Sequence, residues 1–426
     1  MGLALLVGLF ALTLAMGMPI AFGLGVAALV AALYEGLPPL VVFQRMVAGI
    51  NVFSLLAIPF FVFAGELMMR GQIAQRLIAF ADALVGQVRG GLGVVNVFAS
   101  MLFGGISGSA VADTSALGSV LIPMMRKQGY DVDYAVNVTV TSSIAGVMIP
   151  PSHNMILYAL AAGGGVSISA LFLAGIVPGI LMCLCLAVAA WVVAIRRGYP
   201  ARAFPGMRVV LVSAALALPG LMTVVVIIGG VLSGVFTVTE SAAVGAIYAL
   251  LVTVLVYRSL SLRDFWEAVT QAIRTTAMVM ILVGAATAFA YFLSLYRVPE
   301  AIIALLTTIS DRPWVLLLLI NLALLALGMF MDMAALILIC TPIFLPVVRE
   351  IGMDPVQFGM VLMMNLGLGL TTPPVGGCLF VGCAIAKVRM ESVLRTIWPF
   401  YFAILAALML TTYVPAVSMT LPELLR

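Results

Sequence analysis

Long apolar stretches, separated by short polar segments, dominate the sequence from end to end. The clearest are Leu3–Ala15, Pro19–Tyr34, Leu171–Ile195, Val209–Leu232, Ala242–Tyr257, Val315–Phe330 and Thr396–Tyr413. A run of about 20 apolar residues can cross a bilayer as a helix, whereas the strands of a membrane barrel would alternate in polarity. The pattern therefore predicts an all-α polytopic membrane protein. Its first span is expected at the N-terminus, which lacks the features of a signal peptide.

Two segments are amphipathic rather than uniformly apolar. Residues 71–88 place Ile73 and Leu77 on one face of a helix, and residues 261–273 form a similar face that includes Leu262. Helices of this kind lie in the headgroup plane of a membrane. We predict two interfacial arm helices here, with polar cytoplasmic connectors as the alternative.

Composition agrees with a membrane protein. Of the 426 residues, 64% are hydrophobic and only 8% are charged, and the mean hydropathy is +1.27. A soluble protein would carry roughly 25% charged residues. The net charge of +4 is not concentrated into any segment basic enough to predict nucleic-acid binding. One loop carries four arginines, which by the positive-inside rule predicts a cytoplasmic location: Arg196, Arg197, Arg202 and Arg208.

Several kinds of cofactor chemistry find no support in the sequence. The five cysteines show no zinc or haem spacing, and they are expected to be small apolar residues in packed helices. There is no GxxxxGK[ST] phosphate loop, which argues against an ATP-driven pump. We therefore expect no organic cofactor.

The sequence repeats itself at a fixed offset. The segment GVMIPP ends at Pro151 and GLTTPP ends at Pro374, so the offset is 374 − 151 = 223. The same shift pairs Gly105 with Gly328, Pro123 with Pro346, Arg126 with Arg349 and Gly146 with Gly369. Matches of glycine, proline and charge are not explained by hydrophobic bias alone, so the chain is predicted to contain two copies of one unit.

Each copy has a glycine-rich interruption followed by a double proline. The first repeat is predicted to span 1–198, with an interruption near 104–109 and a broken helix near 131–163. The second is predicted to span 209–426, with an interruption near 327–332 and a broken helix near 354–387. Because the segments beside each glycine tip are short for full spans, each repeat is expected to hold a re-entrant helical hairpin. We predict two inverted repeats that form one integral membrane domain.

The prolines have a chemical consequence. Pro373 and Pro374 cannot donate to the carbonyls of Gly369 and Leu370, and Pro150 and Pro151 have the same effect in the first repeat, on Gly146 and Val147. Freed carbonyls persist in a bilayer only where they line a protein or water cavity, and they suit a small cation. The helix that starts beyond each break suits an anion. Two such breaks at matched positions are typical of a secondary transporter with a site halfway through the membrane.

Hydroxyls and carboxylates near the tips and breaks complete the candidate site. The positions predicted to bind sodium are Gly105, Ser107, Ser109, Gly146 and Pro150, with the symmetry mates Gly328, Asp332, Gly369 and Thr372. The positions predicted to contact substrate are Ser109, Asp113, Asn154, Thr371 and Pro373. Oxygen cages of this kind favour sodium over a dedicated divalent-metal site.

Four carboxylates lie in apolar surroundings and are candidates by position: Glu66, Asp113, Glu240 and Asp332. Asp332 is favoured because it falls at a hairpin tip. Asp113 could instead cap the hairpin helix or bridge two elements. Glu66 precedes Arg70 by one helical turn, so an ordinary ion pair is the expected role.

Five ordered motifs carry a resemblance to a known family: GISGSAVADTSALGSVLIPMM, IPPSHN, TVTESAAVGAIYALL, LGMFMD and LTTPPVGG. Together they resemble the large membrane (M) subunit of tripartite ATP-independent periplasmic (TRAP) transporters, from about Pro19 to the C-terminus. The resemblance implies an elevator-type, sodium-driven importer of organic acids (carboxylates) in the bacterial inner membrane. It also implies two partners, a periplasmic substrate-binding protein and a small membrane subunit of about four helices.

Two alternatives remain open from the sequence. A dicarboxylate/sodium symporter that works without a binding protein would need the same hairpins and breaks. A rhomboid-like intramembrane serine protease is the more remote alternative, because GGISGSA contains Gly-x-Ser-Gly and His153, the single histidine, could serve Ser107 as a base. That hypothesis leaves the repeat and the prolines unexplained, so we expect a transporter rather than an enzyme.

Overall fold

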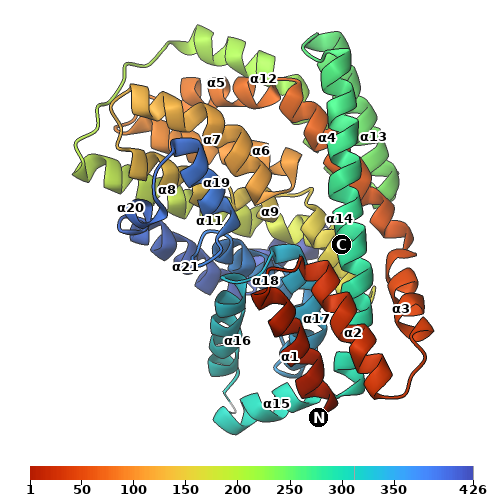
Figure 1. The fold of residues 1–426 in the computed structure, drawn as a ribbon. Helices are drawn as coiled ribbons and strands as arrows, with labels where there is room; N and C mark the ends of the chain where they lie inside the picture. The colour runs from red at the N-terminus through yellow and green to blue at the C-terminus, as the bar shows by residue number, and fades with distance from the viewer. Residues whose placement is uncertain (311, 426) are drawn as a thin grey trace.

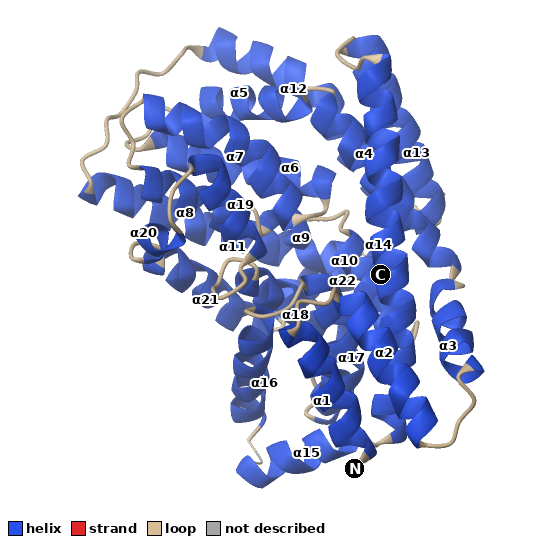
Figure 2. Ribbon diagram, in the orientation of Figure 1, coloured by secondary structure: helices blue, strands red, loops and turns tan. Residues whose placement is uncertain are grey.

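The structure, a computed structural model, describes residues 1–310 and 312–425, and over these residues it is helical with no β-strand (Figure 2). The prediction of an all-α protein is confirmed. Six helices are long and apolar enough to cross a membrane, or up to eight if each of two bent helix pairs is one span. Figure 1 shows a column of long helices, α4, α13 and α14, beside a block that contains α6, α7, α8 and α11.

The N-terminal half contains eleven α-helices. They are α1 (Gly2–Ala15), α2 (Ile20–Tyr34), α3 (Leu40–Ile50), α4 (Ala57–Arg70), α5 (Ile73–Val85), α6 (Gly91–Ser107), α7 (Ala110–Lys127), α8 (Val132–Ser142), α9 (Ala145–Met148), α10 (His153–Ala161) and α11 (Ile168–Arg196), with a 3₁₀ turn (Phe53–Leu56) before α4.

The described part of the C-terminal half contains a further eleven. They are α12 (Met207–Leu232), α13 (Val238–Leu251), α14 (Leu262–Leu295), α15 (Val298–Ile309), α16 (Pro313–Gly328), α17 (Met333–Glu350), α18 (Pro355–Gly369), α19 (Gly377–Ala386), α20 (Met390–Leu394), α21 (Trp398–Tyr413) and α22 (Ala416–Leu424), with a π-helical turn (Val252–Val256) that extends α13. The bounds of α7 and α17 differ by 223 residues at both ends (333 − 110 and 350 − 127).

Four of the predicted spans form helices that are short for a full membrane crossing. Helices α1, α2, α16 and α21 have 14 to 16 residues. At a rise of 1.5 Å per residue, such helices are roughly 21–24 Å long, less than the hydrocarbon thickness of about 30 Å. Helix α1 ends before Gly17, which adopts a left-handed conformation with φ 78°, and α2 starts after Pro19. This turn falls between the two apolar runs predicted at the N-terminus.

The two predicted arm helices have different outcomes. Residues 71–88 contain the separate helix α5, which crosses the top of the view in Figure 1. It buries Ile73, Leu77 and Ile78, whereas Leu84 is 37% exposed. Residues 261–273 do not form a separate helix, because they are the beginning of the 34-residue helix α14. Ser261 and Asp264 form a capping box that starts α14, and no residue before Leu295 ends it.

The two halves of the chain pack against each other in a crossed manner. Helix α7 packs on α19 and helix α17 packs on α10, while α14 contacts α2, α3 and α4. Buried polar side chains connect the packed helices: Asn96 donates to Thr139 at 2.6 Å, and Asn365 donates to the side chain of Asn321 at 2.8 Å. Hydrogen bonds of this kind join helices where lipid provides no hydrophobic driving force.

Candidate functional site

The glycine-rich segment of the first half joins α6 to α7 in a tight turn. Gly108 adopts the left-handed conformation with φ 64°, which a side chain would disfavour, and Ser109 is the N-cap of α7. The Ser109 hydroxyl accepts a hydrogen bond from the Ala112 amide at 3.4 Å. Two helices therefore meet at a narrow tip made of glycine and serine.

This tip lies directly against the double-proline segment that separates α9 from α10. A Cβ atom at Gly104 would lie 2.8 Å from the carbonyl oxygen of Ala145, and one at Gly105 would lie 2.9 Å from that of Pro150. A Cβ at Gly108 would lie 3.4 Å from Nδ1 of His153. Only glycine permits so close an approach, so these residues bring the tip and the break together.

Asp113 is the charged group at this junction. It is fully buried, and the Ser107 hydroxyl donates a hydrogen bond to its Oδ1. Its Oδ2 is also buried, without a hydrogen-bond partner among the described residues, and it lies beside Gly146. A buried carboxylate oxygen with no partner is costly unless a cation or donor accompanies it. Asp113 thus lies where the first tip meets the first break, which goes beyond the role of a helix cap or a bridge that the sequence suggested.

The second tip, between α16 and α17, also contacts its double-proline segment. A Cβ at Gly369 would lie 2.7 Å from the backbone of Gly328. Asp332 is the N-cap of α17, and its Oδ2 accepts from the Ala334 amide at 3.0 Å. Gly328 and Asp332 line a small cavity of about 200 Å³ together with Leu370. The two tips therefore approach their breaks in a similar way. Asp332, which was predicted to bind sodium, caps its own helix, whereas Asp113, which was predicted to contact substrate, has one buried carboxylate oxygen without a partner among the described residues.

The predicted freeing of the second-half carbonyls is wrong in part. The carbonyl of Gly369 accepts from the Thr372 amide at 3.0 Å, and that of Leu370 accepts from the Cys378 amide at 3.0 Å. The hydroxyls of Thr371 and Thr372 both donate to the carbonyl of Leu368 at 2.8 Å. The prolines removed the regular partners, but the chain bends enough for other donors to replace them, as neighbouring groups commonly do at helix breaks in membranes.

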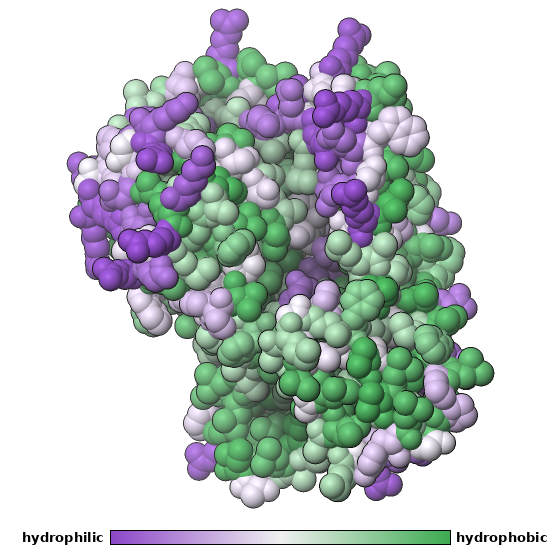
Figure 3. Space-filling view, viewed as in Figure 1, coloured by the Kyte–Doolittle hydropathy of each residue, from purple (hydrophilic) through white to green (hydrophobic). Residues whose placement is uncertain are grey.

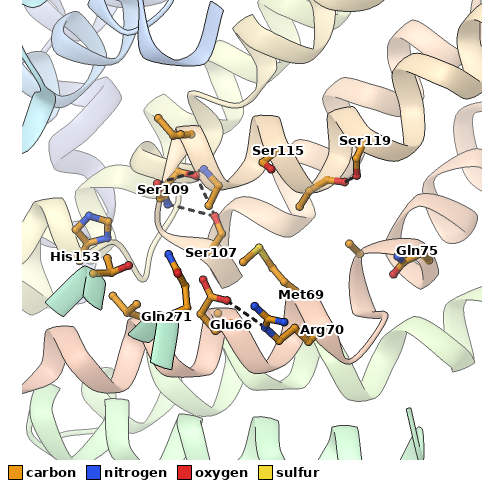
Figure 4. Close-up of a pocket in the computed structure, with 17 residues that line it drawn as sticks. Glu66, Met69, Arg70, Gln75, Ser107, Ser109, Ser115, Ser119, His153 and Gln271 are labelled. Carbon is orange, nitrogen blue, oxygen red and sulfur yellow. Dashed lines mark hydrogen bonds and ion pairs between the residues drawn. The ribbon is translucent and has the colours of Figure 1, made fainter. Parts of the chain in front are cut away.

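A cavity of about 600 Å³ begins at the first tip. In Figure 4, Ser115 and Ser119 follow one wall along α7, and Glu66 and Arg70 of α4 form the opposite wall. Ser107, Ser109 and His153 lie at the inner end, and Gln271 and Thr275 come from α14. Figure 3 shows hydrophilic side chains in the hollow between the two blocks. The cavity is within the usual size range of ligand sites.

Sequence reasoning missed most of this lining, because Gln271 and Thr275 are remote in sequence and carry no motif. Two of the four candidate acids have structural partners. Glu66 lies 3.6 Å from Arg70, as the ion-pair hypothesis predicted. Glu240 forms a capping box with Thr237 at the start of α13. Among the predicted substrate positions, Asn154 is buried in α10 next to His153, and Thr371 is fully buried under Tyr401.

The protease hypothesis is not supported by the geometry at Ser107. Its hydroxyl donates to Asp113, and within the described ranges it makes no hydrogen bond to His153. A serine nucleophile needs its base within hydrogen-bond reach. The Ser107 hydroxyl instead forms a hydrogen bond with the buried Asp113 carboxylate.

Hairpin tips packed on broken helices, inside an apolar helical protein with a polar cavity, define the class as an integral membrane transporter. A family model described as the tripartite ATP-independent periplasmic transporter DctM component matches residues 7–417. The chain is 40% identical over 381 residues to the sialic acid TRAP transporter large permease protein SiaM of Vibrio cholerae, covering 89% of each chain. It is 36% identical over 438 residues to the C4-dicarboxylate TRAP transporter large permease protein DctM of Rhodobacter capsulatus, covering 100% of each.

The protein therefore belongs to the DctM family of TRAP transporter large permeases, as the five motifs suggested. It is a multi-pass inner-membrane protein, and its relatives are named as transport permeases and not as enzymes. The crystal structure of the Alcanivorax borkumensis YdaH transporter has a similar fold, with a TM-score of 0.65, 13% identity and 87% of each chain covered.

Proposed function

We propose that this chain is the transport subunit of a binding-protein-dependent TRAP complex that imports an organic acid across the bacterial inner membrane and is driven by sodium. The names of the relatives support a carboxylate substrate, since they include sialic acid and C4-dicarboxylate permeases. The word tripartite in the family description supports two partners, a small membrane subunit and a periplasmic substrate-binding protein.

One observation carries the sodium assignment. Oδ2 of Asp113 is buried beside Gly146 and has no partner among the described residues, while Oδ1 accepts a hydrogen bond from Ser107. A small cation is the group that best completes this arrangement, because carboxylate, hydroxyl and carbonyl oxygens are hard ligands. Asp113 thus joins Ser107, Ser109 and Gly146 in the first proposed sodium site. Gly328, Asp332, Gly369 and Thr372 form its proposed counterpart.

The substrate carboxylate is proposed to bind at the start of α10. In the described part of the chain no side chain caps this helix, and no acid lies in its first turn, so its first amides remain suited to an anion. Ser152 is the N-cap of α10, and its hydroxyl is fully buried with no partner among the described residues. Asn154 belongs to the same turn. Thr371 and Pro373 contribute from the second break.

The transport movement is proposed to be of the elevator type, with two inverted repeats at 1–198 and 209–426. The common offset of α7 and α17 supports the repeats, and so does the crossed packing of α7 on α19 and α17 on α10. In this proposal the hairpins and breaks move together as one body, which carries ions and substrate past the column that includes α4 and α14. Helices α5 and α15 brace the moving body at opposite faces of the membrane.

The side of the membrane toward which the cavity extends identifies the conformation. It extends from the first tip along α7, whose last turn carries Arg126, and toward Arg70 in the last turn of α4. Arg197 pairs with Asp131, which follows α7 and precedes α8. By the positive-inside rule the end that carries these arginines is cytoplasmic. The conformation is therefore assigned as inward-facing.

Uptake by the reconstituted complex tests the proposal. Proteoliposomes that contain this chain, its small membrane subunit and the binding protein should accumulate an organic acid only when an inward sodium gradient is imposed. A proton gradient that drives uptake without sodium would contradict the ion assignment. Uptake of equal rate without the binding protein would favour the alternative, a binding-protein-independent dicarboxylate symporter. The absence of uptake under every gradient would contradict the transport proposal itself.

A further inference from the structure

The second double-proline break leaves one carbonyl without its regular helical partner. In an uninterrupted helix the amide of Val375 would donate to the carbonyl of Thr371, four residues earlier. In the structure the Val375 amide donates instead to the carbonyl of Met329, in the second tip, at 3.2 Å. One hydrogen bond that the helix has lost therefore ties the break to the tip. The carbonyl of Thr371 needs another donor, because Thr371 is fully buried.

That donor comes from a different helix. The hydroxyl of Tyr401, in the first turn of α21, donates to the Thr371 carbonyl at 2.5 Å. Tyr401 is only 8% exposed, and α21 packs along α18, the helix that the break ends. The ring of Tyr401 meets that of Trp398 edge-on, with the ring centroids 5.9 Å apart. Because the ring is held by this packing, its hydroxyl is directed at the break.

The first break has no corresponding hydroxyl. The 223-residue offset pairs Thr371 with Met148 (371 − 223). It pairs Tyr401 with Pro178 of α11 (401 − 223), which has no hydroxyl. The carbonyl of Met148 faces Gly175 of α11, where a Cβ would lie 2.5 Å from it, and it accepts no hydrogen bond from the described residues. The first break is thus held by close packing on a glycine, and the second by a side-chain hydroxyl.

The position of Val375 connects this hydrogen bond to the second proposed ion site. Val375 and Asp332 line the same cavity of about 200 Å³. Without the Tyr401 hydroxyl, the Thr371 carbonyl would be buried with no donor, which costs more than the hydrogen bond contributes. The Val375 amide is the donor that a regular helix would supply. If the Thr371 carbonyl recaptured that amide, the tip would lose its bond at Met329 and the cavity would change shape.

We infer that Tyr401 is a positioning residue for the second ion site. Its hydroxyl occupies the Thr371 carbonyl, so the Val375 amide stays bonded to the tip and the cavity beside Asp332 keeps the shape that binds a cation. The inference rests on the proposed function, and it adds a residue that acts through the break and not by contact with the ion. The first site has no such residue, since Pro178 occupies the equivalent position.

Removal of one hydroxyl tests this. Tyr401→Phe keeps the ring, and Tyr134→Phe is the matched control. Tyr134 is also buried, and its hydroxyl donates to a helix carbonyl, that of Ala190, at 3.0 Å, although neither residue belongs to a tip or a break. In proteoliposomes that contain the complete complex, Tyr401→Phe should raise the sodium concentration for half-maximal uptake about threefold to tenfold, the factor that corresponds to one hydrogen bond. Tyr134→Phe should leave it unchanged, although both variants lose a similar amount of thermal stability.

The thiol of Cys378 gives a local measurement of the break. Cys378 is the second residue of α19 and fully buried, and it directly follows Gly377, which lines the small cavity. In a background in which the other four cysteines are replaced, N-ethylmaleimide should react with Cys378 at least about threefold faster in Tyr401→Phe at low sodium, because local opening exposes buried groups. Saturating sodium should restore the protection, and Tyr134→Phe should not alter the rate.

The outcomes distinguish this inference from the proposed function. If uptake by the unsubstituted complex depends on sodium and Tyr401→Phe changes neither that dependence nor the labelling of Cys378, the positioning role is overturned and the proposed function stands. An equal effect of Tyr134→Phe also overturns the positioning role, because the cause would be general destabilisation. If uptake by the unsubstituted complex does not depend on sodium, the proposed function itself is contradicted, and the inference is contradicted with it.

Discussion

Asp113 is the residue on which the sodium proposal depends most directly. Its Oδ1 is held by Ser107 and its Oδ2 lies beside Gly146 without a described partner. Replacement by asparagine keeps the shape of the side chain and removes the charge. We expect Asp113→Asn to raise the sodium concentration required for half-maximal uptake at least tenfold, because a difference of about 1.4 kcal/mol in binding is a factor of ten. The measurement is the sodium dependence of uptake in proteoliposomes.

Asp354→Asn provides the control for that experiment. Asp354 caps α18 through the Val356 amide at 2.7 Å, and asparagine caps a helix about as well as aspartate. The sodium dependence of uptake by the Asp354→Asn variant should match that of the unsubstituted protein. An Asp113→Asn variant with unchanged sodium dependence would remove Asp113 from the ion site.

The sequence indicated some of these residues better than others. Ser107 and Ser109 were selected because they lie in a glycine-rich interruption, and in the structure both line the cavity. Asp113 was ranked below Asp332, because sequence position at the tip suggested the latter, whereas the fold uses Asp332 to cap α17. No sequence rule could have selected Gln271, since its relevance arises only when α14 is packed beside α4.

Contact between elements at the second tip depends on two glycines. A methyl group at Gly369 would lie 2.7 Å from the backbone of Gly328, and backbone atoms cannot move aside as a flexible side chain can. We expect Gly369→Ala to reduce stability by about 1–3 kcal/mol, the usual cost of overpacking. Thermal unfolding of the purified protein measures this effect.

Gly229→Ala is the matched substitution in open space. Gly229 lies within α12 and has no atom within 4 Å of the position that a Cβ would occupy. Alanine is the better helix former by up to about 1 kcal/mol, so this variant should be neutral or slightly more stable. Equal melting temperatures for the two variants would contradict the close approach of α16 and α18.

A second connection between elements lies at the arginine-rich end. Arg197 follows α11, and its guanidinium group donates two hydrogen bonds to Asp133 of α8, at 2.9 and 2.8 Å. It donates a third to Asp131 at 3.0 Å. Burial raises the pKa of Tyr199 to about 12, so at neutral pH its hydroxyl stays protonated and donates to Asp131 at 2.7 Å. The Thr396 hydroxyl donates to Asp133 at 2.7 Å, which joins the C-terminal half to the same group.

Removal of Arg197 should loosen this connection. We expect Arg197→Ala to destabilise the protein by about 1–3 kcal/mol, because two carboxylates lose their charged partner. Arg197→Lys should recover only part of the loss, since lysine lacks the planar fork that bonds both oxygens. Arg196→Ala, at the exposed neighbouring position, should change the melting temperature little. A similar loss from both alanine variants would show that the effect comes from net charge and not from the contacts.

The positions at which helices begin and end were the features least predictable from the sequence. The capping box at Ser261 begins α14, but the length of that helix follows from its packing against α2, α3 and α4, which residues 261–273 alone do not reveal. At the N-terminus, by contrast, the two predicted apolar runs match α1 and α2 closely, and the turn that contains Gly17 lies between them. Hydropathy locates an apolar helix well, but it does not show where a long amphipathic helix ends.

At the scale of the whole molecule, the sequence predicted the class correctly because the relevant signals are global. A bilayer admits only helices and closed β-barrels, and the long apolar runs without alternating polarity leave helices, so the fold class follows from hydropathy alone. The crossed contacts of α7 with α19 and of α10 with α17 could not be predicted from the 223-residue offset. An offset establishes that two units are alike, but their relative placement depends on the faces that each unit buries.

The inward-facing assignment leads to a prediction about access from the cytoplasm. Ser119 is exposed on the α7 wall of the cavity. In a background in which the five cysteines, which are all free, are replaced, Ser119→Cys should react with a membrane-impermeant maleimide added to inside-out vesicles. If the hairpin body moves past α4 during transport, this reaction should slow at least threefold when sodium and substrate allow outward-facing states to be occupied, because a state occupied two-thirds of the time removes that share of the accessible molecules.

Ser392→Cys separates movement from general effects on the reagent. Ser392 is exposed on α20, at the same arginine-rich end but outside the cavity. Its labelling should be fast and independent of sodium and substrate. Labelling of Ser119→Cys from right-side-out vesicles only would reverse the assigned orientation. Labelling that is equally fast under all ligand conditions would mean that the cavity does not close, and it would leave the elevator movement without support, because a transporter that keeps one cavity open to one side cannot alternate its access.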